Sequence, residues 1–241
     1  MAKKAAAFQE DHTTELSNAS NITKLTLLSL YHVVFYCDDS TSMRAGSRAD
    51  TQSSLVSRIA RIATKVAPDE ARLDLHFINR DSFTNCDAQQ VEDIIGIINP
   101  NGGSALGTSL RKKILNPLVY DIIQTGEHLK RPILIFTITD GSPTDERYGT
   151  FKKEIVQCRE ALKAAGYPPT SVRFCVSQIG NDTDATRFLD GLANDTEIED
   201  VVRCTTNRLD ERYEELRKNE KELENWLLNV LTSHIVKGTQ F

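Results

Sequence analysis

The sequence predicts an α/β domain with a doubly wound, mostly parallel central sheet, one short antiparallel edge strand and flanking helices, arranged as a three-layer sandwich. Strand-like runs rich in Val, Ile, Leu and Phe alternate with helical patterns along the chain. Strands that alternate with helices pair in parallel through right-handed crossovers. The run at residues 133–138 is apolar at all positions but Thr137, which is typical of a strand that is buried on both faces.

The expected strands and helices follow one another in order. Buried strands are predicted at residues 31–38, 72–79, 131–139, 171–179 and 200–205. Helices are predicted at residues 53–67, 89–98, 106–125, 150–165 and 185–194. The first helix carries apolar residues at helical spacing, which predicts that one face packs on the core: Leu55, Ile59, Ile62, Ala63 and Val66. The short run at residues 82–86 is the expected antiparallel edge strand.

The two ends of the chain differ from this alternating pattern. Residues 1–27 are expected to form a polar leader, and the domain itself is predicted to span residues 28–208. The segment 209–241 predicts one C-terminal amphipathic helix, with Trp226 and Leu227 on its apolar side, that packs on the domain. An apolar stripe of this kind forms core more often than it forms a partner groove, so we expect a monomer or a weak dimer.

Composition and charge exclude several classes of partner. The chain has 241 residues and a net charge of −5, and its basic residues are scattered, whereas nucleic-acid binding needs clustered Lys and Arg. No segment approaches the roughly 20 apolar residues of a membrane span, and the apolar run at residues 5–8 stops too early for a signal peptide. The cysteine count is odd, at five, without a C-x-x-C spacing, which predicts a reduced, cytoplasmic protein.

An Asp-x-Ser-x-Ser motif stands at the end of the first predicted strand. It consists of Asp38, Ser40 and Ser42, which carry one carboxylate and two hydroxyls on alternate residues. Where a chain is extended or turns tightly, alternate side chains can point at one place. Oxygen atoms arranged in this way suit a small, hard divalent cation such as Mg²⁺. The motif is short, so its assignment to a metal site depends on finding further oxygen-bearing residues near it in the fold.

Two further segments are expected at the same edge of the sheet. Ser104 follows Gly102 and Gly103 in a turn that opens the helix near Leu106, and Asp140 ends another apolar strand in Thr-Asp-Gly. In a doubly wound sheet, ligands bind at the carboxyl ends of the strands. The three segments therefore predict a metal site formed by Asp38, Ser40, Ser42, Ser104 and Asp140.

These motifs resemble a von Willebrand factor A domain, whose metal-ion-dependent adhesion site has Asp-x-Ser-x-Ser, a Gly-Gly-Thr-like turn and Thr-Asp-Gly in the same order. The resemblance extends over about residues 31–206. The sequences around Asp38 and Asp145 are most similar to those of intracellular fungal members of the family. The chain departs from the pattern at Ser104, where Thr is usual. Serine lacks the methyl group that restricts χ1, so its hydroxyl is less preorganised. Thr108 is the alternative residue in the segment 102–108, which we call the third loop, and we prefer Ser104 because two glycines precede it.

The resemblance implies a binding protein and no enzyme. Ser40 and Ser42 would hold the metal directly, Ser104 directly or through water, and Asp38 and Asp140 mainly through water or hydrogen bonds. The implied cation is Mg²⁺, with Mn²⁺ or Ca²⁺ as alternatives. Because hydroxyl ligands leave the cation much of its charge, an Asp or Glu of a protein partner can fill its open position.

The same residues allow other interpretations. Asp38 could serve a Mg²⁺-dependent phosphatase or phospho-acceptor enzyme, although such enzymes need an aspartate where Ser40 stands. The chain could also act in assembly through its C-terminal helix. The serines could simply cap turns, leaving a vestigial site. Asp39 is expected to be a solvated neighbour of the site, and Asp145 and Glu146 are expected in an exposed loop.

Overall fold

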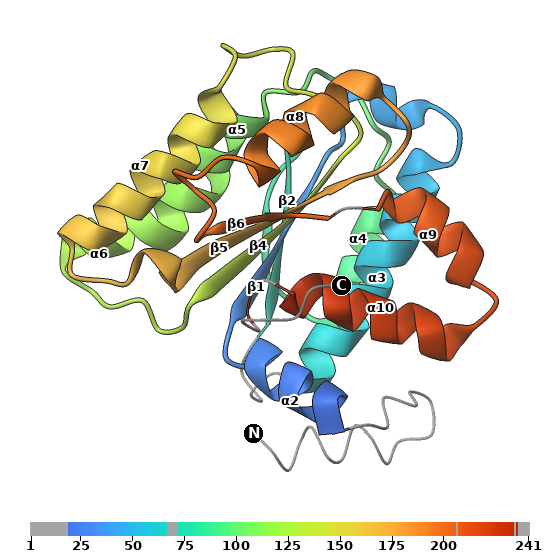
Figure 1. Ribbon diagram of the computed structural model, residues 1–241, viewed down its shortest axis with the longest axis horizontal. Coiled ribbons are helices and arrows are strands. Elements are labelled where there is room, and N and C mark those ends of the chain that lie inside the picture. The colour runs from blue at the N-terminus through green and yellow to red at the C-terminus, as the bar shows by residue number, and fades with distance from the viewer. Residues whose placement is uncertain (1–18, 67–71, 206, 234, 236–241) are drawn as a thin grey trace.

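The computed structural model describes residues 19–66, 72–205, 207–233 and 235, and they form a sheet between two layers of helices (Figure 1). The sheet has six strands in the order β3-β2-β1-β4-β5-β6. Their bounds are β1 (His32–Cys37), β2 (Leu73–Phe77), β3 (Phe83–Cys86), β4 (Ile133–Thr139), β5 (Val172–Gln178) and β6 (Val202–Cys204). Only the β2–β3 pair is antiparallel among these strands. The predicted fold class is confirmed.

The two central strands, β1 and β4, are each paired with a strand on both sides and buried on both faces, and this explains the continuous apolar runs in their sequences. β1 pairs with β2 on one side and with β4 on the other, so that Val34 lies opposite both Asp74 and Ile135. All residues of β4 are buried. Side chains of β1 alternate between two apolar clusters, with Phe35 on one face of the sheet and Val34 on the other. A strand that is covered on both faces needs apolar residues at consecutive positions.

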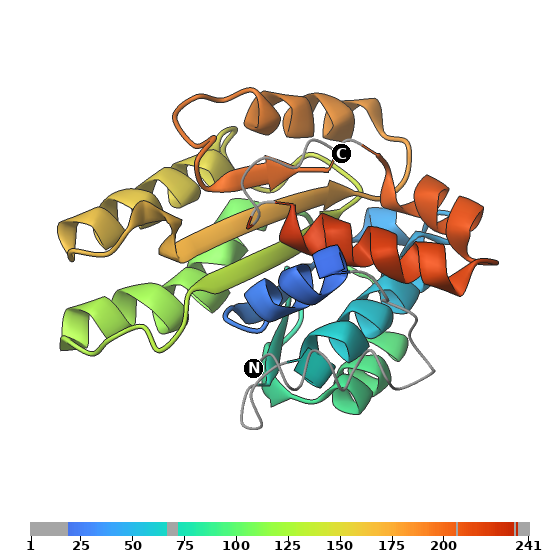
Figure 2. The same cartoon turned by 60° about the horizontal axis from the view of Figure 1, so that its bottom comes forward.

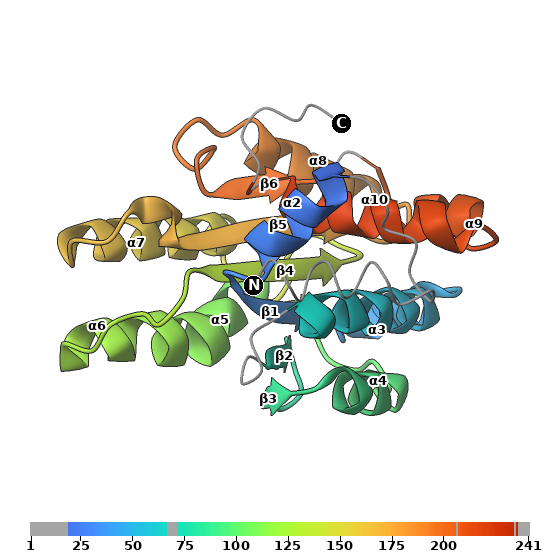
Figure 3. The ribbon, with the colours of Figure 1, turned by 90° about the horizontal axis from the view of Figure 1, so that it is seen from below.

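Helices cover both faces of the sheet (Figure 3). One face carries α2 (Ala19–Leu28), α3 (Arg48–Val66), α4 (Ala88–Gly96), α9 (Leu209–Leu216) and α10 (Glu220–Thr232). The other carries α5 (Leu106–Leu110), the π-helical segment η2 (Arg111–Tyr120), α6 (Asp121–Thr125), α7 (Thr150–Ala164) and α8 (Thr183–Ala193). Short 3₁₀ turns lie at η1 (Thr41–Arg44) and η3 (Pro169–Ser171). The predicted helix at residues 106–125 includes η2, where Pro117 supplies no backbone donor.

The expected polar leader is wrong for residues 19–27, because they lie in α2. Leu25 and Leu28 of this helix are buried in the core. Asn21 Nδ2 donates to Asn225 Oδ1 at 2.6 Å, and Lys24 Nζ donates to Asn229 Oδ1 at 2.5 Å, so α2 is attached to α10 by polar contacts as well. Figure 2 shows the two helices side by side. The rest of the expected leader, residues 1–18, lies outside the described part of the chain.

The C-terminal segment forms two helices where we expected one. α9 ends at Leu216, and α10 begins after Asn219, whose side chain accepts a hydrogen bond from the Glu222 amide at 3.3 Å. An asparagine at this position satisfies a free amide at the start of a new helix. Leu223 and Leu227 of α10 are fully buried in the core. The apolar side of α10 is therefore used in packing on the domain, while residues 236–241 lie outside the described range.

Two further properties bear on the environment of the protein. No helix among the described residues is both long and apolar enough to cross a bilayer. The cysteines at positions 37, 86, 158, 175 and 204 are all buried and free. Burial raises the pKa of the Cys158 and Cys175 thiols to about 12, so they act as small apolar core residues.

Candidate metal-binding site

The predicted residues meet at the carboxyl ends of the central strands. The loop after β1, the turn before α5 and the loop after β4 together line a pocket of about 540 Å³. Ser40, Ser42, Ser104 and Asp140 are among its lining residues. Asp38 lies beneath them and is fully buried. The structure therefore brings all five predicted residues to one edge of the sheet.

A chain of hydrogen bonds links the loop after β1 to the end of β4. Ser42 Oγ donates to Asp140 Oδ1 at 2.8 Å, and the Ser40 and Ser42 hydroxyl oxygens lie 3.0 Å apart. Asp38 accepts from the Ser40 amide at 2.9 Å and from Thr139 Oγ1 at 2.7 Å. Both carboxylates therefore orient neighbouring groups while the serine oxygens line the pocket, and this arrangement can hold a cation through hydroxyl oxygens.

Ser104 is the residue that lacks a partner in this arrangement. Its side chain is buried, and its Oγ has no hydrogen-bond partner within the described structure. A buried hydroxyl without a partner costs about 1–3 kcal/mol. The Ser104 carbonyl accepts from the Thr144 amide at 3.2 Å, which holds the turn against the loop after β4. An unsatisfied oxygen in the wall of this pocket fits a bound cation or its water.

Thr108, the alternative third-loop residue, is engaged elsewhere. Its hydroxyl donates to Glu146 Oε2 at 2.9 Å, and the same carboxylate accepts from the Gly107 and Thr108 amides, each at 2.8 Å. These are free amides at the start of α5, where a negative side chain stabilises a helix. Glu146 is therefore a helix cap, and the expectation that it merely lies in an exposed loop is wrong. Asp145 is exposed as expected.

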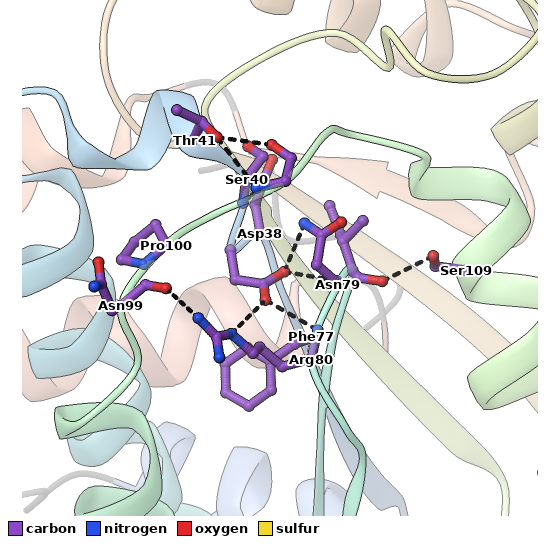
Figure 4. A network of polar contacts seen from close by, with 12 residues as sticks. Asp38, Ser40, Thr41, Phe77, Asn79, Arg80, Asn99, Pro100 and Ser109 are labelled. Carbon is purple, nitrogen blue, oxygen red and sulfur yellow. Dashed lines mark hydrogen bonds and ion pairs between the residues drawn. The ribbon is translucent and has the colours of Figure 1, made fainter.

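Asp39 is also placed differently from our expectation of a solvated residue. It is fully buried. Its Oδ1 accepts from the Asn79 amide at 2.8 Å, and its Oδ2 accepts from the Arg80 amide at 3.1 Å. Figure 4 shows Asn79 and Arg80 turned toward the end of β1, with the Arg80 guanidinium reaching the Asn99 carbonyl. The backbone amides of Asn79 and Arg80 lie beyond the end of β2 and have no partner strand, so the Asp39 carboxylate supplies their hydrogen-bond acceptor.

Asn79 extends this network to the third loop. Its side-chain amide donates to the Gly103 carbonyl at 2.9 Å. Gly102 has a φ of +107°, and a Cβ there would lie 2.6 Å from Asn79 Oδ1, so only glycine fits. The position of Ser104 thus depends on Asp39 through Asn79. Sequence reasoning missed Asn79, because no motif marks it, although the adjacent Asp38-Asp39 pair was a usable signal for a buried network.

Arg48 is a second residue of the pocket that sequence reasoning missed. It begins α3, and its Nη1 lies 2.6 Å from Asp140 Oδ2, in a pair that leaves Asp140 only 1% exposed. A Cβ at Gly180 would clash with Arg48 Nε, so the arginine also fills the space beside that loop. The motif contains no signal for this contact. Only the fold brings the first turn of α3 to the end of β4.

The electrostatics of the pocket favour an added cation. Burial raises the pKa of Asp38 to about 6, the hydrogen bonds from Ser40 and Thr139 oppose this rise, and the negative charge of Asp140 adds to it. A nearby cation stabilises a buried carboxylate in its charged form. In the described part of the chain, no group of three His, Cys, Asp or Glu side chains could hold a metal ion. The side chains that line this pocket with oxygen atoms include Ser40, Ser42, Ser104 and Asp140. Such oxygens suit hard cations such as Mg²⁺.

We expect Arg48→Met to raise the Mg²⁺ affinity about tenfold, or 1.4 kcal/mol. The guanidinium sits on the carboxylate that Ser42 also contacts, so it repels any dication held there. Methionine keeps an apolar stem and removes the charge. Calorimetric titration with Mg²⁺ measures the effect. Arg44→Met is the matched control, because Arg44 Nε donates to the Pro100 carbonyl and contacts no carboxylate of the site. Unchanged or weaker binding in Arg48→Met would contradict this repulsion.

Comparison with known proteins supports the fold. No protein-family model matches the sequence, and no curated protein matches it. Proximal thread matrix protein 1 from the mussel byssus is similar in structure, with a TM-score of 0.53 at 15% identity over 84% of this chain and 48% of that one. A von Willebrand factor type A structure from Catenulispora acidiphila has a TM-score of 0.51 at 15% identity over 84% of this chain and 43% of that one.

The mussel protein has also been solved with a zinc-occupied MIDAS motif, and that structure has a TM-score of 0.50 at 17% identity over 80% of this chain and 47% of the other. This chain thus spans less than half the length of each of these three structures. Sequence identities this low support a similar fold and nothing more. With the strand order, the antiparallel edge strand and these likenesses together, the chain has the α/β fold of von Willebrand factor A domains.

Proposed function

We propose that this protein is a metal-dependent protein-binding module. Ser40, Ser42 and Ser104 hold Mg²⁺, with Mn²⁺ or Ca²⁺ as alternatives, and Asp38 and Asp140 support it through water or hydrogen bonds. The observation that carries the proposal is the unpartnered Ser104 hydroxyl in the wall of the pocket that Ser40, Ser42 and Asp140 also line. The zinc-occupied motif of the mussel protein supports divalent metal binding on this fold.

When bound, the cation supplies a positive charge that attracts a carboxylate of the partner. This chain orients the site: Asp140 holds the Ser42 hydroxyl, and Asp38 holds the Ser40 amide. Because the directly bound groups are hydroxyls, little of the cation's charge is neutralised within the protein. The partner group that we propose is therefore an Asp or Glu at the tip of a loop or in an extended segment.

The two alternative functions have less support. A phosphatase or phospho-acceptor enzyme would need Asp38 as a nucleophile, yet Asp38 is fully buried and both of its oxygens accept hydrogen bonds. Assembly through the C-terminal helices would need a free apolar side, yet Leu223, Leu227 and Leu231 of α10 are fully buried in this domain. We therefore propose that the protein binds rather than catalyses, and that it is a monomer or a weak dimer.

A selection experiment tests the proposed function. The full chain is immobilised and presented with two displayed libraries of random heptapeptides, one with Glu and one with Gln at the central position. We expect the Glu library alone to yield peptides that bind in Mg²⁺ and are released by EDTA. Peptides that stay bound in EDTA, or equal recovery from both libraries, would contradict a carboxylate bound at a metal.

Substitutions in the third loop separate Ser104 from Thr108. We expect Ser104→Ala to weaken Mg²⁺ binding by about 1 kcal/mol, typical of one hydrogen-bonding group, without lowering the melting temperature, since this hydroxyl has no partner to lose. Ser104→Thr should keep or slightly strengthen the affinity. Thr108→Ala should lower the melting temperature and leave metal binding unchanged, because it removes a contact to Glu146. Weaker metal binding in Thr108→Ala alone would assign the third loop to Thr108.

The five free, buried cysteines support a further part of the proposal, which is that the protein works in a reducing compartment such as the cytoplasm. We also propose that the protein is similar to intracellular fungal members of the family. This similarity rests on the sequences of the motifs around Asp38 and Asp140. Thiol alkylation of the protein isolated from its own cells, with and without prior reduction, tests the first part. Cysteines that react only after reduction would contradict it.

A further inference from the structure

A second pocket lies directly beside the proposed metal site. Its volume is about 430 Å³, and it shares Ser142 and Asp184 with the pocket of the metal site. Its apolar lining comes from the loop after β4, from α7 and from α8, and includes Pro143, Tyr148, Phe151, Phe188 and Leu192. Figure 1 places α7 and α8 next to each other on one face of the sheet. We call this hollow the aromatic pocket.

Two features make the aromatic pocket suited to an apolar side chain. The rings of Phe151 and Phe188 meet edge to face with 5.9 Å between their centroids, which forms an aromatic wall. Tyr148 is 97% exposed, although large apolar side chains that are this exposed are uncommon in the described structure. Exposed aromatic residues beside a pocket are typical anchors of a protein interface.

We propose that the partner segment places a large apolar or aromatic side chain in the aromatic pocket, within three residues of the acidic residue that reaches the metal. This inference rests on the proposed function and names the kind of partner. The two pockets share a wall, so their occupants must be close in space. An extended segment advances about 3.3 Å per residue, and neighbours one to three positions apart can therefore fill both pockets at once.

The charged residues that line the two pockets indicate which charges the partner segment carries. Asp145 and Asp182 line the metal pocket, and neither has an ion pair within the described residues. Asp184 and Asp195, at the aromatic pocket, are each paired with a cation, namely Arg187 and Lys152. The uncompensated charge is thus negative. A second acidic residue next to the first would be repelled, so the matching segment has one acid, one large apolar residue, and basic or neutral flanks.

Gly191 offers a clean way to block the aromatic pocket. It lines this pocket on α8, and a Cβ added to it would meet no atom within 4 Å. Gly191→Leu therefore adds a large side chain at the lining of the aromatic pocket, with a Cβ that clashes with nothing, and leaves the serines and aspartates of the metal site unchanged. Gly96→Leu is the matched control, because Gly96 is also an exposed helical glycine with open space around it and lies on α4, outside both pockets.

The test uses the displayed heptapeptides with a central Glu, selected on the wild-type chain in Mg²⁺. We expect most selected peptides to carry Phe, Tyr, Trp, Leu or Met within three residues of the Glu, and few to carry a second acid. Replacing that apolar residue with Ala in a synthetic peptide should lower the affinity at least about tenfold. Gly191→Leu should lower the affinity of the original peptide by a similar factor, while Gly96→Leu should not.

Calorimetric titration with Mg²⁺ distinguishes loss of the aromatic pocket from loss of the metal site. The wild type, Gly191→Leu and Gly96→Leu should all bind Mg²⁺ equally. Mg²⁺-dependent peptides without an apolar preference would overturn this inference and leave the proposed function standing. The same holds if Gly191→Leu binds the selected peptides as tightly as the wild type does. If neither library yields a Mg²⁺-dependent peptide, the proposed function is overturned, and this inference with it.

Discussion

Asp140→Ala is expected to lower the Mg²⁺ affinity at least about 100-fold, or 2.7 kcal/mol, while the protein stays folded. Asp140 accepts hydrogen bonds from Ser42 and Arg48, so its removal takes away a negative charge and leaves the Arg48 guanidinium facing the pocket. The serine hydroxyl also loses the acceptor that orients it. Calorimetry with Mg²⁺ measures the affinity, and circular dichroism with thermal unfolding verifies the fold.

A second aspartate tests whether position matters more than general charge. Asp145 is exposed and lines the same pocket, but it contacts neither Ser42 nor Arg48. We expect Asp145→Ala to weaken Mg²⁺ binding only about twofold, as is usual for a solvent-screened charge. Equal Mg²⁺ affinity in the wild type and in Asp140→Ala would remove the proposed site.

Asp39→Ala should lower the free energy of unfolding by about 3 kcal/mol, because it leaves two backbone amides and one side-chain amide without their acceptor. The residue is fully buried and accepts from the Asn79 and Arg80 amides and from Asn79 Nδ2. For a chain of this size, the loss corresponds to a fall in melting temperature of about 6–12 °C. Urea unfolding followed by fluorescence of Trp226 measures it.

Asp39→Asn is the informative companion variant, since its amide keeps one acceptor oxygen and the shape of the side chain. We expect it to lose about 1 kcal/mol, clearly less than the alanine variant. Metal affinity should fall in the alanine variant as well, because Asn79 also holds the Gly103 carbonyl beside Ser104. Unchanged stability in Asp39→Ala would mean that the loop after β2 does not depend on this carboxylate.

The strands and the convergence of the motifs could be predicted because each rests on a local rule. β4 is buried on both faces and therefore had to be apolar at almost every position. Asp38 and Asp140 each follow a strand, and the carboxyl ends of parallel strands share one edge of a sheet. Once the alternation of strands and helices was recognised, the meeting of these two residues followed from topology, without knowledge of any side-chain contact.

The element boundaries at the two ends of the chain depended on packing and capping. The segment containing α2 is weakly apolar, yet Leu25 and Leu28 are buried because α3 and α10 leave a surface for them to cover. The pattern after Leu209 keeps its helical spacing through residues 217–219, and spacing alone cannot show a break. The break is set by the Asn219 side chain, which caps α10.

The sequence by itself determined the order of the elements, the sheet, and which oxygen-bearing residues stand at strand ends, because side-chain periodicity and strand direction are properties of the local chain. Only the tertiary structure decided the partners of those residues. Arg48 reaches Asp140 across 92 positions of sequence, and Asn79 links Asp39 to the turn before Ser104. Contacts of this kind depend on the distances between packed elements, which no local pattern encodes.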